Sequence, residues 1–220
     1  MNNHRFERES GTLEERLSAA LAKVALASRH ALVRRAAQDG LSAVQAQVLS
    51  VLVREGSIEA GPLAARLGLT GPTVSDAVAA LERKGYVRRE QVAGDRRRVR
   101  VCATASGAAI GTRLALWPEI LLHGLEPLSE PERAVLFSAL SKVILSLLDR
   151  GVIQEARMCA TCSHFRPLVH PGSPEPHHCA LVDVPLGPSA LRIDCPDHDQ
   201  GRTPSEALAI VGAWSEGSGT

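Results

Sequence analysis

Apolar residues recur at steps of three and four along much of the chain, which places them on one face of a helix. The first such stretch starts at Leu13, runs to about Ala37 and stops near Gly40. A second stretch begins after Ser42, whose side chain is suited to cap a first turn, and ends at Gly56. The pattern therefore predicts two amphipathic helices at the start of the chain.

Two shorter helices are predicted next, separated by a tight turn. Leu63 and Leu67 share one face of the first, and Gly68 stands where a left-handed residue commonly ends a helix. Thr70 caps the second helix, which extends to Gly85. Two short helices joined by three or four residues are typical of a helix-turn-helix.

A β-hairpin is predicted in the stretches YVRREQV and RRVRVCA, because both alternate and carry β-branched residues. Gly94 and Asp95 lie between the two stretches and supply the turn. A single helix is then expected from about Ser106 to His123. The hairpin therefore follows the helix-turn-helix directly, as a wing does.

A long helical pattern lies after Pro127. Ser129 and Glu132 form a capping box at its start, and the helix is expected to run to Gly151. Its apolar residues form a wide stripe, made up of Val135, Leu136, Leu140, Val143, Ile144 and Leu147. A stripe of this width is buried on two sides, which predicts a subunit interface.

The character of the sequence changes at Arg157, after which Cys, His, Pro and Gly become frequent. Helical periodicity returns only in TPSEALAIVGAW, where Thr203 and Glu206 form another capping pattern with Pro204 between them. Four parts are expected: a flexible N-terminus at 1–12, a helical and winged domain at 13–150, a Cys- and His-rich module at 157–214, and a disordered tail at 215–220.

Composition supports a helical protein, because aromatic residues make up only 3% of the chain and much of the apolar content is Ala, Leu and Val. The expected fold class is mainly α with a small β-wing, plus a small loop-rich C-terminal module. The N-terminus is polar and there is no apolar run of about 18 residues, so secretion and membrane insertion are not expected. An odd number of cysteines without a signal peptide indicates a reducing, cytoplasmic compartment.

The net charge of +1 is unevenly distributed. Between Arg83 and Arg100 the chain has eight basic and two acidic residues, a local charge of about +6. A basic run alone is equally typical of a solvated surface. Beside a helix-turn-helix, it indicates contact with DNA.

The stretch LAARLGLTGPTVSDAVAALERKGYVRREQVAGDRRRVRVCATASG resembles the MarR family of winged-helix regulators, as does LSAVQAQVLSVL before it. The resemblance covers roughly residues 13–150, with the KGYV, GDRRRVRV and ATASG motifs in the family's order and spacing. It implies a transcription regulator, expected to be a repressor, that binds a pseudo-palindromic operator as a homodimer formed by residues 13–37 and 106–150. It also implies a small-molecule effector site between the dimer helices and the DNA-binding lobe.

The second helix of the helix-turn-helix has one apolar face, formed by Val74, Val78 and Leu81, and its opposite face is therefore expected to be exposed. Short polar side chains there can reach phosphates and base edges in the major groove. The expected DNA contacts are Thr70, Pro72, Thr73, Ser75 and Asp76 on this helix and Arg96, Arg97 and Arg98 in the wing. Asp76 departs from the family pattern, because many relatives have a basic residue there and a carboxylate repels phosphate.

Four cysteines, Cys159, Cys162, Cys179 and Cys195, follow the spacing Cys-x2-Cys-x16-Cys-x15-Cys. Thiolates cluster in this way to hold zinc or an iron–sulfur cluster. Two of the cysteines arrive singly after long loops, which is less typical of zinc. The spacing resembles that of high-potential iron–sulfur proteins and of the small subunits of some glycyl-radical enzymes, which implies a 4Fe-4S rather than a 2Fe-2S cluster, with zinc as the alternative.

Three functions remain open for the whole chain. The first is a DNA-binding regulator whose operator affinity responds to redox state, oxygen or iron through the cluster. The second is a ligand-responsive repressor with a structural zinc module, and the third is an electron-transfer or enzyme-subunit module tethered to a DNA-binding domain. A catalytic triad, a phosphate loop and paired carboxylates are missing from the sequence, so an enzyme is not expected.

Most of the five histidines of the module are expected to be exposed loop residues. Cys102 is expected to be a buried, small apolar residue.

Overall fold

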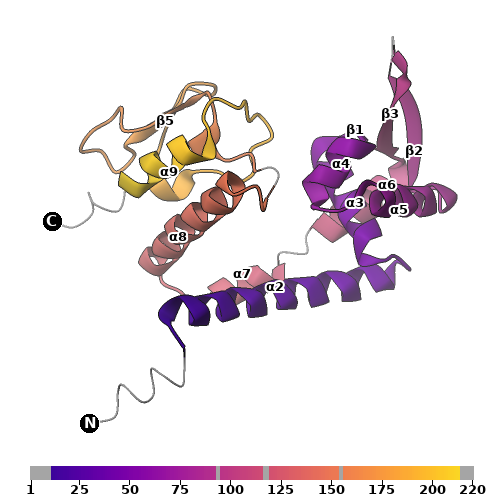
Figure 1. Ribbon diagram of the computed structural model, residues 1–220, viewed down its shortest axis with the longest axis horizontal. Helices are drawn as coiled ribbons and strands as arrows, with labels where there is room; N and C mark the ends of the chain where they lie inside the picture. The colour runs from indigo at the N-terminus through magenta and orange to yellow at the C-terminus, as the bar shows by residue number, and fades with distance from the viewer. Residues whose placement is uncertain (1–10, 93–94, 116–118, 154–155, 214–220) are drawn as a thin grey trace. The chain divides into compact units, whose positions relative to one another are not determined.

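The computed structural model describes residues 11–92, 95–115, 119–153 and 156–213 (Figure 1). The chain forms two compact units, one comprising Met1–Leu63 and Gly71–Glu126, the other Ala64–Thr70 and Pro127–Thr220. The predicted terminal segments, 1–12 and 215–220, fall almost entirely outside the described residues. No helix in the described ranges is long and apolar enough to cross a membrane.

The N-terminal half of the chain contains the expected helices and hairpin. Its elements are α2 (Leu13–Gln38), α3 (Ala43–Glu55), β1 (Ile58–Glu59), α4 (Ala60–Leu67), α5 (Gly71–Arg83), β2 (Val87–Val92), β3 (Asp95–Ala103), α6 (Ala105–Ala115) and α7 (Glu119–Leu125). The capping box at Ser42 and Gln45 starts α3, and Gly68 ends α4 in the left-handed region at φ +62°. The predicted boundaries of the helix-turn-helix are therefore confirmed.

The single helix predicted from about Ser106 to His123 is described at both ends. Helix α6 covers Ala105–Ala115 and α7 covers Glu119–Leu125. Residues 116–118 themselves lie outside the described ranges.

Helix α3 lies at the centre of the first unit and packs on α2, α5, α6 and β3. The core consists mainly of aliphatic side chains from three helices: Val48, Leu49 and Leu52 of α3, Val74, Val78 and Leu81 of α5, and Ile110 and Leu114 of α6. Gly107 and Gly111 let α6 approach its neighbours closely, because a Cβ at Gly107 would collide with the Tyr86 carbonyl and one at Gly111 with the Leu49 carbonyl.

The wing is an antiparallel sheet with strand order β1-β3-β2. Val87 pairs with Ala103 and Glu90 with Arg100, and the register shifts at Val92. Gly94 lies outside the described residues, and Asp95 begins β3 rather than occupying the turn. Figure 1 shows β2 and β3 as a long hairpin that projects from the helices of this unit.

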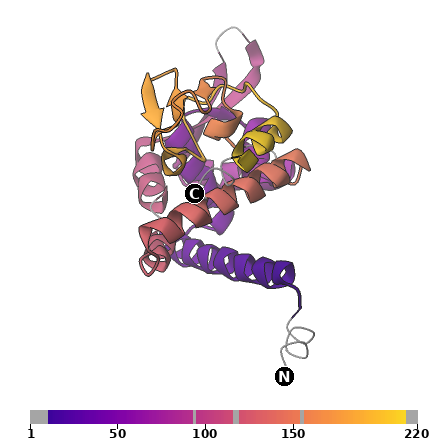
Figure 2. The same ribbon diagram turned by 90° about the vertical axis from the view of Figure 1, so that its left-hand side faces the viewer.

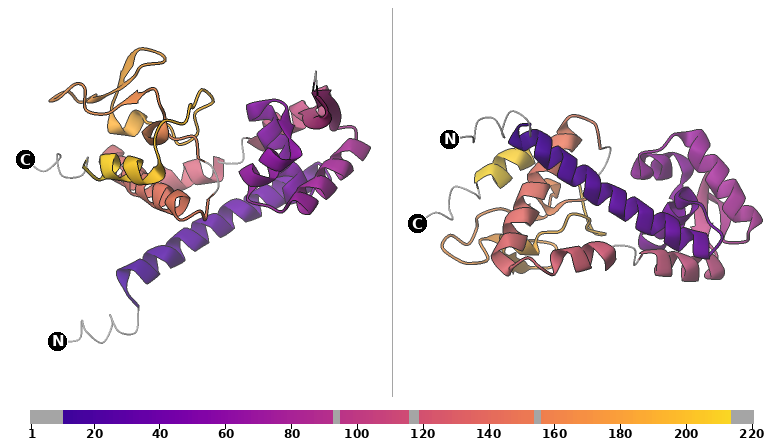
Figure 3. Two further views of the ribbon diagram at one scale, coloured as in Figure 1. Left: turned by 45° about the horizontal axis from the view of Figure 1, so that its top comes forward. Right: turned by 90° about the horizontal axis from the view of Figure 1, so that it is seen from below.

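Helix α2 is a single rod of 26 residues that Figure 3 shows uninterrupted. Only its C-terminal part is buried, at Leu32 and Ala36. Its exposed apolar side chains are Leu13, Leu17, Leu21, Val24, Leu26 and Val33.

The second unit combines a long helix with the cysteine-rich segment. Its elements are α8 (Glu130–Asp149), η1 (Cys159–Thr161), β4 (Phe165–Arg166), β5 (His177–Cys179), β6 (Val184–Leu186), η2 (Pro188–Ala190) and α9 (Pro204–Ala213). The strands form a small antiparallel sheet in the order β4-β5-β6. The capping boxes expected at Ser129 and Thr203 are both present, so the predicted starts of α8 and α9 are confirmed.

Helix α8 packs directly on the cysteine-rich segment, and α9 lies along it (Figure 2). Leu145 of α8 is fully buried among Met158, Ala160, Ala207 and Val211. The predicted boundary lies after residue 150, whereas the compact units divide before Pro127. Leu145, which the module buries, lies outside the stripe predicted on α8. Of that stripe, Ile144 packs against the same core, while Val135 and Val143 are exposed.

Candidate DNA-binding surface and cysteine pocket

Helix α5 separates buried from exposed residues cleanly. Val74, Ala77, Val78 and Leu81 are buried in the core of the unit. Five of the eight residues predicted to contact DNA lie on α5 or just before it, and all five are exposed: Thr70, Pro72, Thr73, Ser75 and Asp76. The helix therefore offers a short polar face that starts at its N-terminus, as a helix reading the major groove requires. Contact of each residue with DNA remains a prediction.

The three wing arginines all lie in β3. Arg98 is exposed, and its Nε donates to Glu59 Oε1 of β1 at 3.0 Å. This bond ties the middle of β3 to the strand that precedes α4. The side chains of Arg96 and Arg97 fall outside the described part of the chain.

Several basic residues near the wing have partners within the protein. Lys84 Nζ donates to the Gly40 carbonyl at 2.6 Å, and Arg88 Nε lies 2.6 Å from Glu90 Oε1. Ion pairs at exposed positions contribute only about 0 to 1 kcal/mol each. Exchanging an exposed pair such as Arg88 and Glu90 for a contact with a DNA phosphate would therefore cost little.

Cys102 is buried in β3, as expected. Its thiol donates to Glu90 Oε2 at 3.1 Å. Burial raises the pKa of Cys102 above its ordinary value, and the hydrogen bond to Glu90 raises it further. A thiol held in its protonated form is a poor nucleophile, so Cys102 is suited to packing rather than to sensing.

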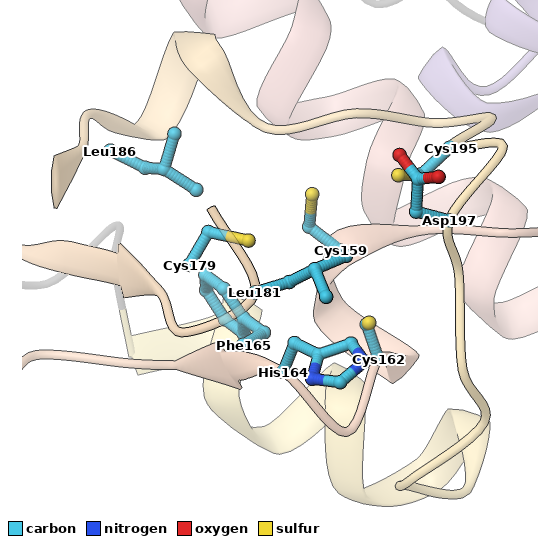
Figure 4. A pocket seen from close by; sticks show the side chains of 9 residues that line it. All are labelled: Cys159, Cys162, His164, Phe165, Cys179, Leu181, Leu186, Cys195 and Asp197. Carbon is cyan, nitrogen blue, oxygen red and sulfur yellow. The ribbon is translucent and has the colours of Figure 1, made fainter. Parts of the chain in front are cut away.

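The four remaining cysteines line one pocket of the second unit (Figure 4). Cys159 belongs to η1 and Cys162 follows it, Cys179 ends β5, and Cys195 lies in the loop after η2. All four thiols are free rather than joined in disulfides. Figure 4 shows the sulfur atoms arranged around a common space, whose other lining residues are His164, Phe165, Leu181, Leu186 and Asp197.

Backbone hydrogen bonds bring these cysteines together. The Cys159 N–H donates to the Arg192 carbonyl at 3.0 Å, and the Cys195 N–H donates to the Arg157 carbonyl at 2.9 Å. These two bonds pair the segment before η1 with the segment that carries Cys195. In the small sheet, Cys179 is the antiparallel partner of Phe165. Cysteines far apart in sequence thus reach one pocket through regular backbone pairing.

The turn that carries Cys159 and Cys162 is held from outside by residues before α9. Arg202 donates to the carbonyls of Cys162 and Phe165, at 2.7 and 2.8 Å. The Gly201 N–H donates to the Thr161 carbonyl at 3.0 Å. A side chain at Gly201 would collide with Ser163, so this approach requires glycine.

The pocket brings four thiols together with the apolar side chains of Phe165, Leu181 and Leu186 and the polar side chains of His164 and Asp197. Burial is the main cause that raises the pKa of Cys159 above its ordinary value. A metal that binds such a thiol favours its deprotonated form. Across the described residues, no group of three or more His, Cys, Asp or Glu side chains has an arrangement that could hold a metal ion.

The histidines of the module are less exposed than expected, so that prediction is wrong. His177 is fully buried and its ring lies 5.3 Å from that of Phe165. His164, His178 and His198 are half-buried, and only His170 is exposed. Sequence alone did not separate them, because loop residues lack the periodicity from which burial is inferred.

Comparison with known proteins identifies the N-terminal part of the chain. The family model for the MarR family matches residues 39–98, which span the helix-turn-helix and most of the wing. An uncharacterized HTH-type transcriptional regulator of Mycobacterium leprae is 31% identical over 140 residues, which are 63% of this chain and 96% of that protein. The chain belongs to the MarR family. It is a DNA-binding transcriptional regulator of the winged-helix type.

Solved structures of MarR-family regulators support the same fold. The MepR–DNA complex of S. aureus is 26% identical with a TM-score of 0.53, and the match covers 59% of this chain and 97% of MepR. A mutant of E. coli MarR in complex with operator DNA is 25% identical with a TM-score of 0.50, covering 60% of this chain and 99% of MarR. More than a third of this chain therefore lies outside each of these matches.

Proposed function

We propose that this MarR-family protein is a homodimeric repressor whose affinity for its operator is set by a 4Fe-4S cluster bound to Cys159, Cys162, Cys179 and Cys195. The observation that carries the proposal is that these four free cysteines line one pocket. DNA binding itself belongs to α5 and the wing. The relatives MepR and MarR, both solved in complex with DNA, support that assignment.

The residues of the pocket fit an iron–sulfur cluster. Four cysteine thiolates are the usual ligand set of such clusters, and the apolar side chains of Phe165, Leu181 and Leu186 would limit the access of water. When bound, the cluster would supply a redox-active centre that also cross-links the four segments carrying the cysteines.

The spacing of the cysteines along the chain favours a cluster over a single zinc ion, because two of the four arrive singly after long loops. Tetrahedral zinc brings its sulfur ligands to roughly 3.8 Å from one another, because each Zn–S bond is about 2.3 Å long. Four cysteines line the pocket, which is the number of thiolates that a 4Fe-4S cluster takes. A cluster keeps its four thiolates further apart, because each thiolate binds a different iron.

Successive residues around Cys159 face the pocket and α8 in turn, which links the two. Cys159 lines the pocket, while its neighbours Met158 and Ala160 are buried against Leu145 of α8. A shift of the turn at Cys159 therefore moves residues that support α8. Two stable arrangements of this turn would give α8 two packing environments, which is the kind of element a switch needs.

A dimer would connect α8 with DNA binding. Helix α2 exposes six large apolar side chains, and α8 exposes Val135 and Val143 on the side that the module leaves uncovered. Exposed apolar surface of this extent is typical of an interaction site. In a homodimer built from these helices, a change in the packing of α8 would alter how the two DNA-binding units are held.

The test begins with protein purified without oxygen. Bound iron and sulfide in equal amounts, with visible absorption and no zinc, are expected. Replacing Cys159, Cys162, Cys179 or Cys195 singly by alanine should abolish the bound metal and expose the module to protease. Cys102→Ala is the matched control and should retain the metal, because Cys102 lies in the other unit, where its thiol is hydrogen-bonded to Glu90.

Operator binding is then compared before and after mild oxidation. Affinity should change in the parent protein and in Cys102→Ala, but not in Cys179→Ala. One zinc per chain, together with an operator affinity that does not change on oxidation, would support the structural zinc module instead. Iron and sulfide in the parent protein, with operator binding independent of cluster state, would support the tethered electron-transfer module.

A further inference from the structure

Arg192 contacts two of the four cysteines at once. Its backbone N–H donates to Cys159 Sγ at 3.2 Å, and its guanidinium Nη1 donates to Cys195 Sγ at 3.6 Å. These are the first and last cysteines of the motif. One residue therefore bridges sulfur atoms that are 36 positions apart in the sequence.

The neighbours of Arg192 hold it in this position. Leu191 is buried with Cys162 and Phe165, and Ile193 packs against the separate core around Leu145. The Arg192 carbonyl also accepts the hydrogen bond from the Cys159 N–H. The backbone at Arg192 is thus fixed on both sides and by its own pairing, which keeps its N–H directed at sulfur.

Two side chains of opposite charge lie near the sulfur atoms. Arg192 brings a positive charge, and Asp197, which lines the pocket, brings a negative one. An arginine guanidinium stays protonated in proteins, so Arg192 holds a permanent positive charge beside the pocket.

We propose that Arg192 is the positioning residue that sets the redox potential of the cysteine pocket, with Asp197 opposing it. The inference rests on the proposed cluster. Hydrogen bonds to sulfur and nearby charge are two of the main influences on the potential of a thiolate-bound iron–sulfur centre. Reduction adds one electron and thus one negative charge, which Arg192 stabilises and Asp197 destabilises.

The experiment uses the full chain, purified without oxygen and titrated with dithionite as the one-electron reductant. Arg192→Gln should lower the ratio of reduced to oxidised protein at a fixed potential by roughly fivefold, the effect of one exposed charge pair. For a one-electron couple this is a fall of about 40 mV in midpoint potential. The midpoint potential of Arg192→Lys should fall less, because lysine keeps the positive charge. Asp197→Asn should raise the midpoint potential. Arg166→Gln is the control and should leave the midpoint potential unchanged, since Arg166 donates to the carbonyls of Ser163 and Phe165 rather than to sulfur.

Iron content separates a role in potential from a role in structure. Shifts of opposite sign in Arg192→Gln and Asp197→Asn, at iron content equal to that of the parent, would support the inference. Unchanged midpoints at equal iron content would overturn it and leave the proposed cluster standing. If Arg192→Gln loses its iron, the midpoint potentials of Arg192→Lys and Asp197→Asn are compared with that of the parent protein. A midpoint potential unchanged in both variants overturns the inference. A parent protein without iron would overturn both this inference and the proposed cluster.

Discussion

Replacing Leu145 by alanine tests whether α8 belongs to the core of the cysteine module. Leu145 is 0% exposed and contacts residues of η1 and α9. Truncating a fully buried leucine removes its contacts and leaves a cavity, at a cost of about 3 kcal/mol. Because Leu145 lies in the small core of the second unit, this cost should appear as easier opening of that unit alone.

Hydrogen–deuterium exchange read by mass spectrometry measures this opening peptide by peptide. Under conditions where exchange reports the opening equilibrium, peptides from η1 and α9 should exchange about 100-fold faster in Leu145→Ala, because 1.4 kcal/mol changes an equilibrium tenfold. Peptides from α3 and α5 should exchange at the parent rate. The two sets are compared within one sample, so differences in protein preparation cancel.

Val135→Ala is the matched control on the same helix. Val135 is 70% exposed, and its truncation should change the free energy of opening by less than about 0.5 kcal/mol. Unchanged exchange of η1 and α9 in Leu145→Ala would refute the reasoning that these elements share a core with α8. So would an equal acceleration in α3 and α5, because the effect would then not be confined to one unit.

Three further predictions concern the DNA-binding unit. Arg96→Ala should weaken binding to operator and random DNA alike. Because one phosphate contact is lost, the slope of log affinity against log salt concentration should become shallower by about one unit. An unchanged slope would show that Arg96 does not contact a phosphate. Thr73→Ala should reduce discrimination between operator and random DNA by about 1 to 3 kcal/mol, and undiminished discrimination in competition assays would show that α5 does not use Thr73. Gly107→Ala should destabilise the unit strongly, because the new Cβ would collide with the Tyr86 carbonyl, and a parent-like midpoint in urea would contradict this.

Much of the first unit could be predicted because its signals are local. The capping box at Ser42 and the left-handed Gly68 act within one helical turn, and they define helix ends without reference to the rest of the fold. Alternation predicted the hairpin for the same reason. The helix expected from Ser106 to His123 rests on a local apolar pattern as well, and Pro118 within it lies outside the described residues.

The second unit could be predicted only in part, because its features depend on distant pairing. The spacing of the cysteines predicted a shared site, and the pocket brings all four together. The wide stripe on α8 predicted burial on two sides, but periodicity does not identify the partner that covers each side. The approach of Arg192 to Cys159 and Cys195 depends on backbone pairing between segments about 35 residues apart, which leaves no pattern in the sequence.

The burial of Leu145 has a consequence for any shortened form of this chain. A protein that stopped after α8 would leave Leu145 in water, together with Ile144 and Leu148 that pack beside it. Such a form would need either substitutions on that face of the helix or another surface to cover it. The C-terminal segment is therefore not a removable appendage: α8 carries side chains suited to its presence, and the two must change together.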